Sequence, residues 1–211
     1  MRLAWFDSAL DLIFPPRCVG CGRVDTLWCP TCQHDIEAIP APPPDLLEGQ
    51  IPVAATAPHE GKLRSAIHSL KYEHCPQLAM PLGERLGHRL STLNWKYDIL
   101  VPVPLHTDRL RERGYNQSQL LGEQIAALHG LPLVAEALVR TRATRPQVGL
   151  NREQRRENMR EVFRADPHLV ADRAVLLVDD VYTSGATLEA CAQALLAAGA
   201  VRVAGLTITS A

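Results

Sequence analysis

Two adjacent carboxylates and several hydroxyl groups lie together in the segment VLLVDDVYTSGAT, residues 175–187. Its apolar start predicts a strand buried on both faces, and the alanine-rich stretch that follows predicts a helix. Backbone N–H groups at a helix start bind anions, and the hydroxyls around Gly185 add donors. Asp179 and Asp180 are acceptors suited to sugar hydroxyls or Mg²⁺. The segment therefore predicts a site for a ribose 5-phosphate, whereas a plain capped helix would explain Thr183 or Asp180 alone.

We expect the whole loop to line this site, with the two acids as the candidates for catalysis. The predicted site residues are Asp179, Asp180, Val181, Tyr182, Thr183, Ser184, Gly185, Ala186 and Thr187.

Four cysteines near the start form two C-x2-C pairs, Cys18 with Cys21 and Cys29 with Cys32, separated by seven residues. This spacing predicts a structural Zn²⁺ site, because each pair points two sulfurs at one ion and four thiolates complete a tetrahedron. Two disulfides are disfavoured in a cytoplasmic protein, and a redox pair needs only one such motif. A closed site leaves no position for substrate, so this metal would stabilise the fold.

Strand and helix patterns alternate after residue 50, which predicts an α/β fold with a mostly parallel sheet flanked by helices. The expected strands are 51–58, 97–105, 136–141, 174–181 and 201–210, and the expected helices are 62–72, 77–90, 118–128 and 187–198. Ligands bind such sheets beyond the carboxyl ends of the strands, which is where the acidic and hydroxyl-rich segment falls.

A proline-rich stretch, IPAPPPD at residues 39–45, divides the chain. Its prolines cannot continue regular pairing, so we expect a stiff extended linker. The predicted organisation is a front part, 1–44, with a short N-terminal helix, the four-cysteine module and the linker. The α/β domain would occupy 45–211.

Net charge and hydropathy exclude several classes of protein. The formal charge is −1 over 211 residues, which predicts neither a general nucleic-acid binder nor a membrane-surface protein. No stretch approaches the ~20 apolar residues of a membrane span. The apolar start contains Asp7 and Asp11 and lacks a cleavage site, so a signal peptide is not expected. A cytoplasmic location without membrane insertion follows as the expectation.

The segment at 175–187 resembles the phosphoribosyl pyrophosphate motif of the type I phosphoribosyltransferases. Further stretches resemble the ComF branch, the amidophosphoribosyltransferase-like competence proteins. They are the four-cysteine front, SLKY at 69–72, PVPL at 102–105, RERGYNQSQLLG at 111–122 and RPQVGLNREQRRENMREVF at 145–163. The resemblance covers nearly the whole chain in the family's order. Ser184 stands where the family often has threonine, and both keep the hydroxyl.

This resemblance implies a type I phosphoribosyltransferase fold, a zinc-ribbon-like front module and a role in DNA uptake or utilisation during competence. Asp179 and Asp180 would hold the ribose hydroxyls and Mg²⁺, and residues 183–187 would hold the 5-phosphate of phosphoribosyl pyrophosphate. Residues 101–104 would form the backbone loop that receives diphosphate. The diphosphate-binding candidates are Lys71, Pro104, Arg109 and Arg113. A plain surface lysine at 71 and a solvated helix start near Arg109 are the alternatives.

Seven arginines fall in residues 140–160. Such a segment between strands fits a loop that closes over the site, a solvated basic helix face, or a surface for single-stranded DNA.

Two hypotheses about function follow. The protein could transfer a phosphoribosyl group to an unknown acceptor and release pyrophosphate. Alternatively, it could be a non-enzymatic adaptor of the DNA-uptake machinery that binds nucleotide or single-stranded DNA and contacts competence proteins.

Overall fold

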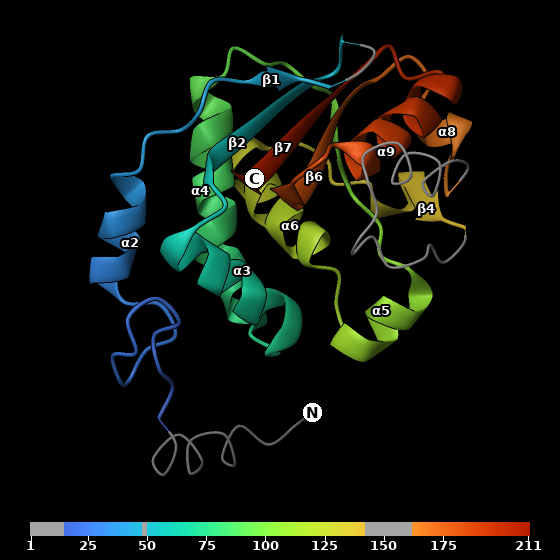
Figure 1. Ribbon diagram of the computed structural model, residues 1–211. Helices are drawn as coiled ribbons and strands as arrows, with labels where there is room; N and C mark the ends of the chain where they lie inside the picture. The colour runs from blue at the N-terminus through green and yellow to red at the C-terminus, as the bar shows by residue number, and fades with distance from the viewer. Residues whose placement is uncertain (1–14, 48–49, 142–161) are drawn as a thin grey trace.

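The computed structural model describes residues 15–47, 50–141 and 162–211 (Figure 1). The strands are β1 (Asp45–Leu46), β2 (Pro52–Pro58), β3 (Ile99–Pro102), β4 (Leu138–Arg140), β5 (Phe163–Ala165), β6 (Ala174–Tyr182) and β7 (Arg202–Ser210). The helices are α2 (Pro30–Glu37), α3 (Gly61–Tyr72), α4 (Ala79–Thr92), α5 (Thr107–Arg113), α6 (Gln117–His129), α8 (Pro167–Val170) and α9 (Ala186–Ala197), with short 3-10 turns η2 (Pro76–Leu78) and η3 (Ala135–Ala137).

A five-stranded sheet with the order β1-β2-β7-β6-β3 forms the centre of the molecule. The neighbours β2–β7, β7–β6 and β6–β3 are parallel, and only the short edge strand β1 runs antiparallel. The prediction of an α/β fold with a mostly parallel sheet is therefore confirmed. A separate antiparallel pair, β4 with β5, lies beside it.

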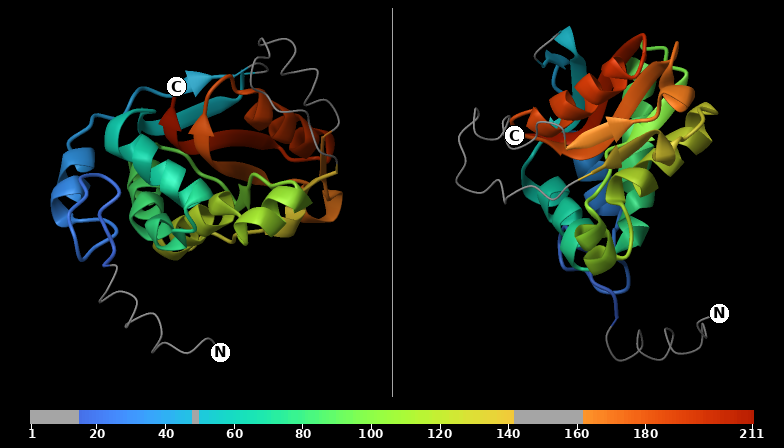
Figure 2. Two further views of the ribbon diagram at one scale, coloured as in Figure 1. Left: turned by 60° about the horizontal axis from the view of Figure 1, so that its bottom comes forward. Right: turned by 90° about the vertical axis from the view of Figure 1, so that its right-hand side faces the viewer.

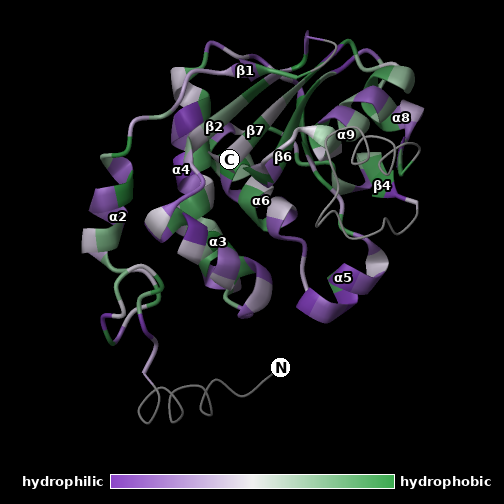
Figure 3. Cartoon of the chain, in the orientation of Figure 1, coloured by the Kyte–Doolittle hydropathy of each residue, from purple (hydrophilic) through white to green (hydrophobic). Residues whose placement is uncertain are grey.

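Side chains of the central strand β6 alternate between two hydrophobic cores. Val175 and Leu177 face one core, with α9 above them, whereas Leu176 and Val178 face the other, with α3, α4 and α6. This period of two is what a strand buried on both faces requires. Figure 2 shows the two layers of helices on opposite sides of the sheet, and Figure 3 shows apolar residues concentrated between them.

The front module packs against the α/β domain through α2. Ile36 is fully buried in the same core as residues of α3 and α4. Arg85 of α4 donates from Nη1 to the Ile36 carbonyl at 2.6 Å, and Lys62 of α3 forms an ion pair with Asp35. The division of the chain near residue 45 stays a prediction, although β1 begins there.

The local structure differs from expectation in several places. Strand β6 ends at Tyr182, one residue later than expected, and Asp179 and Asp180 lie inside it. Helix α2 begins in the second cysteine pair, with Pro30 in its first turn, and was not expected. The residues around Arg109 form a complete short helix, α5, which ends at Gly114.

The predicted N-terminal helix and most of the arginine-rich segment lie outside the described residues. Among the helices that are described, none is long and apolar enough to cross a membrane.

Candidate functional site

The carboxyl end of β6 passes through a tight turn into α9. Gly185 forms the N-cap of α9 with φ of 80°, a conformation that favours glycine. A Cβ at this position would lie 2.7 Å from Cδ2 of Leu47 and 3.2 Å from Cε2 of Tyr182. Because no side chain caps this helix start, its first N–H groups remain available to an anion.

The hydroxyl groups of this turn are also available. Within the described chain, the side chains of Thr183, Ser184 and Thr187 make no hydrogen bond to another residue. They line a small cup of about 20 Å³ together with Asp179, Val181, Tyr182, Gly185, Ala186 and Leu188. The Tyr182 hydroxyl donates to Asp45 at 3.0 Å, which ties the turn to the edge strand β1. The turn is thus held in shape while its donors stay free.

Asp179 is buried, with 9% of its surface exposed. Its Oδ1 accepts hydrogen bonds from the Ser118 hydroxyl at 2.8 Å and from the Asp180 backbone N–H at 2.9 Å. Burial and the negative charge of Asp180 raise the pKa of Asp179 to about 7, although Lys71 and Ser118 act in the opposite direction. Its carboxyl group can therefore take up or release a proton near neutral pH.

Asp180 forms a buried ion pair with Lys71 from the last turn of α3. The Lys71 ammonium lies 2.8 Å from Asp180 Oδ1, and the two side chains are 21% and 4% exposed. Burial lowers the pKa of Lys71, but the Asp180 carboxylate outweighs it, so the pKa is raised and the amine stays charged. The second carboxylate oxygen, Oδ2, is buried and has no hydrogen-bond partner among the described residues. One acceptor of this carboxylate is thus unused among the described residues.

The other three predicted diphosphate-binding residues differ in how near they lie to the site at residues 179–187. Pro104 follows the end of β3, at the same sheet edge as the end of β6. Arg113 lies over the Tyr72 ring at 5.5 Å and donates to Gln117, which places it beside the end of α3. Arg109 is exposed and pairs with Glu112 at 2.7 Å. In the described part of the chain, no contact joins Arg109 to the turn at residues 183–187.

Two residues near the site were not singled out from the sequence. Ser118 is fully buried at the start of α6 and orients Asp179. His59 follows β2 at the same sheet edge, and its Nδ1 lies 2.8 Å from the Thr209 hydroxyl. Burial, with Lys71 and Arg64 nearby, lowers the pKa of His59. The position of Ser118, two residues after the capping residue Asn116, is a local signal in the sequence. No local signal marks His59.

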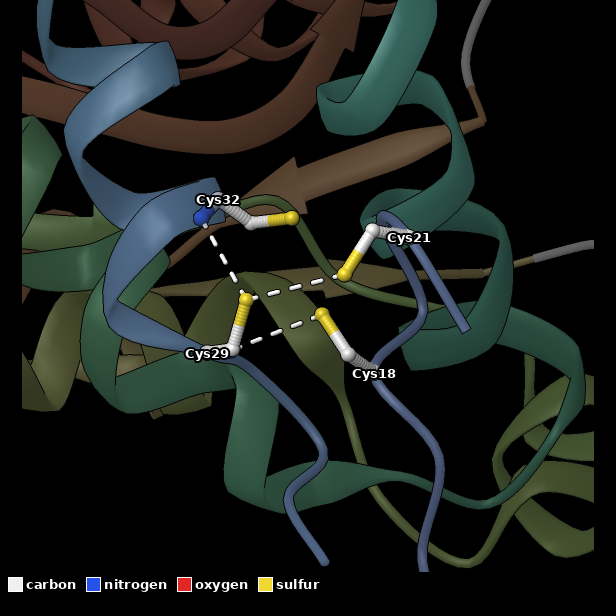
Figure 4. A group of neighbouring side chains, drawn as sticks. All are labelled: Cys18, Cys21, Cys29 and Cys32. Atoms are coloured by element: carbon white, nitrogen blue, oxygen red, sulfur yellow. Dashed lines mark hydrogen bonds between the residues drawn. The ribbon is translucent and has the colours of Figure 1, made fainter. Parts of the chain in front are cut away.

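The four cysteines of the front module form one cluster (Figure 4). Their sulfur atoms all lie within 4.8 Å of one another, and those of Cys21 and Cys29 are 3.6 Å apart. Zn–S bonds of about 2.3 Å in a tetrahedron place sulfurs about 3.8 Å apart. The backbone N–H groups of Cys29 and Cys32 each donate to a cysteine sulfur at 3.4 Å. This cluster could therefore hold a metal ion.

The surroundings of the cysteine cluster are close-packed. A Cβ on Gly20 would lie 2.8 Å from the sulfur of Cys32, so only glycine fits there without a shift. Trp28 packs against the cluster and donates from Nε1 to Gln33 at 2.6 Å. Burial raises the pKa of Cys32 to about 12, while hydrogen bonds from backbone N–H groups outweigh burial and lower the pKa of Cys18 to about 6. A bound dication would favour the thiolate form of all four.

Comparison with known proteins places the chain in a family. The phosphoribosyl transferase domain matches residues 116–209. The chain is 34% identical over 199 residues to the DNA utilization protein YhgH of Escherichia coli O157:H7, covering 88% of this chain and 85% of that protein. It is also 36% identical over 94 residues to competence protein F of Haemophilus influenzae, covering 44% of this chain and 41% of that protein. The chain belongs to the ComF family.

Competence protein ComFC of Bacillus subtilis is 32% identical over 104 residues, covering 49% of this ComF-family chain and 40% of that protein. The matched domain begins at Asn116, the N-cap of α6, and ends in β7. It therefore includes Ser118, both acids and the Gly185 turn, whereas Lys71 and the four cysteines lie before it.

Proposed function

We propose that this ComF-family protein binds the ribose 5-phosphate part of phosphoribosyl pyrophosphate at residues 179–187. The supporting observation is the combination of an uncapped helix start, free hydroxyls at Thr183, Ser184 and Thr187, and an unpartnered oxygen on buried Asp180. The first two suit a phosphate, and the last suits a sugar hydroxyl. Their place at the carboxyl end of a central parallel strand is where α/β sheets bind ligands.

Two sets of side chains in the described structure also suit metal ions, Asp180 for Mg²⁺ and the four cysteines for Zn²⁺. The unpartnered Oδ2 of Asp180 is a hard oxygen ligand of the kind that Mg²⁺ accepts with waters and substrate phosphates. When bound, Mg²⁺ would neutralise part of the diphosphate charge. Zn²⁺ is the proposed occupant of the cysteine cluster, because four thiolates at this spacing suit its tetrahedral geometry.

The activity that we propose for this site is phosphoribosyl transfer. An acceptor would attack the anomeric carbon as the bond to diphosphate breaks, and positive charge would develop on the ribose ring. The carboxylates of Asp179 and Asp180 would stabilise that charge while holding the ring hydroxyls. Lys71 forms an ion pair with Asp180 and holds its carboxylate in position. Pyrophosphate release with phosphoribosyl pyrophosphate and a panel of nucleobases would identify an acceptor, whereas binding without turnover would favour an adaptor.

Calorimetric titration of phosphoribosyl pyrophosphate, with Mg²⁺ and then with EDTA, tests the binding site. The double variant Asp179→Asn with Asp180→Asn keeps the side-chain size and removes both charges. Losing one charge-assisted hydrogen bond costs about 1.5–3 kcal/mol, which corresponds to an affinity about tenfold to a hundredfold weaker. Asp108→Asn on α5 is the matched control, because its side chain is 73% exposed. Equal affinity in the wild type and the double variant would place the site elsewhere.

The names of the relatives support a competence-related role in DNA uptake or utilisation. One surface favours a second candidate function, the binding of single-stranded DNA. Arg64, His68 and Tyr72 form one exposed stripe along α3, and the His68 and Tyr72 rings are 5.1 Å apart. Tyr72 is 61% exposed, and Arg64 lines a groove of about 690 Å³ with Arg17. Exposed rings with arginines beside them suit stacked bases and phosphates.

Fluorescence anisotropy of a labelled single-stranded oligonucleotide tests this second function. We expect binding that weakens steeply with salt, and a flatter salt slope when Arg17 and Arg64 are both replaced by alanine. Tyr72→Ala should weaken binding without changing that slope, because stacking involves no phosphate. Arg164→Ala, on β5 at the α9 side of the sheet, is the control. If the Arg17 and Arg64 double variant and Tyr72→Ala both bind as the wild type does, the stripe is not the DNA surface.

A further inference from the structure

A second groove lies apart from the 179–187 site, where α2 and the proline-rich linker meet α4 and β2. Figure 1 shows α2 and the linker beside α4. The groove has a volume of about 460 Å³. Its walls include Gln33 and Glu37 of α2, Thr56 of β2, and Arg85 and Arg89 of α4. It therefore joins the four-cysteine module to the α/β domain.

Arg85 is charged but contacts only neutral acceptors. Its guanidinium donates to the carbonyls of Ile36, Thr56 and Ile39 at 2.6, 2.9 and 3.4 Å, and to the Thr56 hydroxyl at 2.8 Å. Glu37 is the single acid among the described residues that line the groove, and its Oε1 accepts from Gln33 at 2.6 Å. No carboxylate in the described chain lies within ion-pair distance of Arg85.

Arg89 has still fewer partners. It donates to the Pro42 carbonyl at 2.6 Å and to the Thr92 hydroxyl at 3.3 Å. Its Nε is buried and has no hydrogen-bond partner within the described residues. Burial lowers the pKa of both arginines. The groove thus holds two partly desolvated guanidinium groups whose charge no described carboxylate neutralises by contact.

Such an arrangement suits a bound oxyanion. Arg85 and Arg89 are four residues apart on one helix, where like charges repel each other. Guanidinium groups bind phosphate and carboxylate with paired donors, and a bound anion would remove the repulsion. Ile39 and Ala41 of the linker supply an apolar wall, and exposed His88 adds a polar side chain. The groove therefore offers charge for one end of a ligand and an apolar surface for the other.

We propose that this junction groove binds a small organic oxyanion, a phosphate or carboxylate on a planar or apolar body of about nucleoside size. Arg89 is its main charged contact. Because the ligand would touch α2, the linker and α4 together, its binding would stabilise the packing of the four-cysteine module on the domain. This proposal goes beyond the phosphoribosyl site and does not depend on it.

Calorimetric titration and thermal unfolding in a phosphate-free buffer test the proposal on the full chain. The probes are adenosine 5′-monophosphate, adenosine alone, inorganic phosphate and citrate. We expect the monophosphate or citrate to bind and raise the unfolding temperature, and Arg89→Gln to weaken that binding about tenfold or more. His88→Glu, at an exposed helical position, should also weaken it by adding a negative charge to the lining. Arg111→Gln on α5, with a side chain 82% exposed, is the control and should bind as the wild type does.

Gly185→Val separates this groove from the phosphoribosyl site, because it obstructs the turn without touching the groove. Binding that survives Gly185→Val and falls in Arg89→Gln and His88→Glu belongs to the groove. Binding that is lost in Gly185→Val and kept in both groove variants belongs to the phosphoribosyl site and overturns the proposal. Absence of binding by every probe overturns it as well, and the separate titration of phosphoribosyl pyrophosphate with Mg²⁺ then decides the phosphoribosyl proposal.

Discussion

Replacing Lys71 with methionine should destabilise the protein far more than a typical lysine substitution. Methionine keeps the unbranched, apolar part of the side chain and removes the ammonium that lies 2.8 Å from Asp180. Asp180 would remain 4% exposed beside the buried carboxyl of Asp179, with no cation in contact. Breaking a buried pair in this way costs about 3–5 kcal/mol. Because the Lys71 side chain is still 21% exposed, we expect a loss of stability at the lower end of this range, about 3 kcal/mol.

Lys62→Met is a matched control on the same helix. Lys62 also pairs with an aspartate, Asp35, but those side chains are 32% and 46% exposed. An exposed pair contributes little because water screens it, so Lys62→Met should change the free energy of unfolding little. Adding Asp180→Asn to Lys71→Met should restore part of the loss, because it removes the uncompensated charge.

Urea unfolding followed by circular dichroism measures these differences, with an unchanged m value as the check that the same surface unfolds. A loss of about 3 kcal/mol corresponds to a fall of about 6–12 °C in unfolding temperature for a chain of this size. The reasoning fails if Lys71→Met loses no more stability than Lys62→Met, or if the double variant is less stable than Lys71→Met alone.

Other predictions follow from the two sites. Metal analysis should give about one Zn²⁺ per chain, and Cys29→Ser should release it while Cys75→Ser does not, as a closed four-thiolate site requires. Gly185→Val should lose phosphate-dependent binding, because the residue combines φ of 80° with a Cβ 2.7 Å from a neighbouring side chain. Ser118→Ala should lower the free energy of unfolding by about 1–2 kcal/mol by removing a buried donor to Asp179. In EDTA, urea titration should show the Asp179 carboxyl destabilising the fold as pH rises from about 4 to about 7. Its pKa is raised to about 7, so the folded protein keeps a proton that the unfolded chain has lost; an Asp179→Asn variant that keeps the wild-type pH profile would contradict this.

Much of the fold was predictable because its signals are local. The apolar runs that became β2, β3, β6 and β7 lie at their expected places, and the helix after Gly185 begins within one residue of expectation. The cysteine spacing likewise predicted one cluster, since a C-x2-C turn fixes two sulfurs by itself.

Contacts between distant segments could not be predicted in the same way. Lys71 and Asp180 are far apart in sequence, and only the packing of α3 against the end of β6 brings the ammonium to the carboxylate. The pairing of β6 with β7, which runs through Asp179 to Tyr182, likewise joins two separate segments, and the sequence of β6 alone does not indicate which strand lies beside it. The same limit applies to Arg109, whose neighbour Glu112 competes for its guanidinium once α5 forms.

The packing of Trp28 against the cysteine cluster gives the protein an intrinsic optical sensor. Its indole lies against the sulfurs and donates to Gln33, so loss of a metal ion would alter both its polarity and its freedom to move. Only three tryptophans occur in the chain, and Trp95 packs edge-on against Tyr97. A change in emission wavelength on chelation, absent from a Trp28→Phe variant, would therefore follow the occupancy of the front module without any added label.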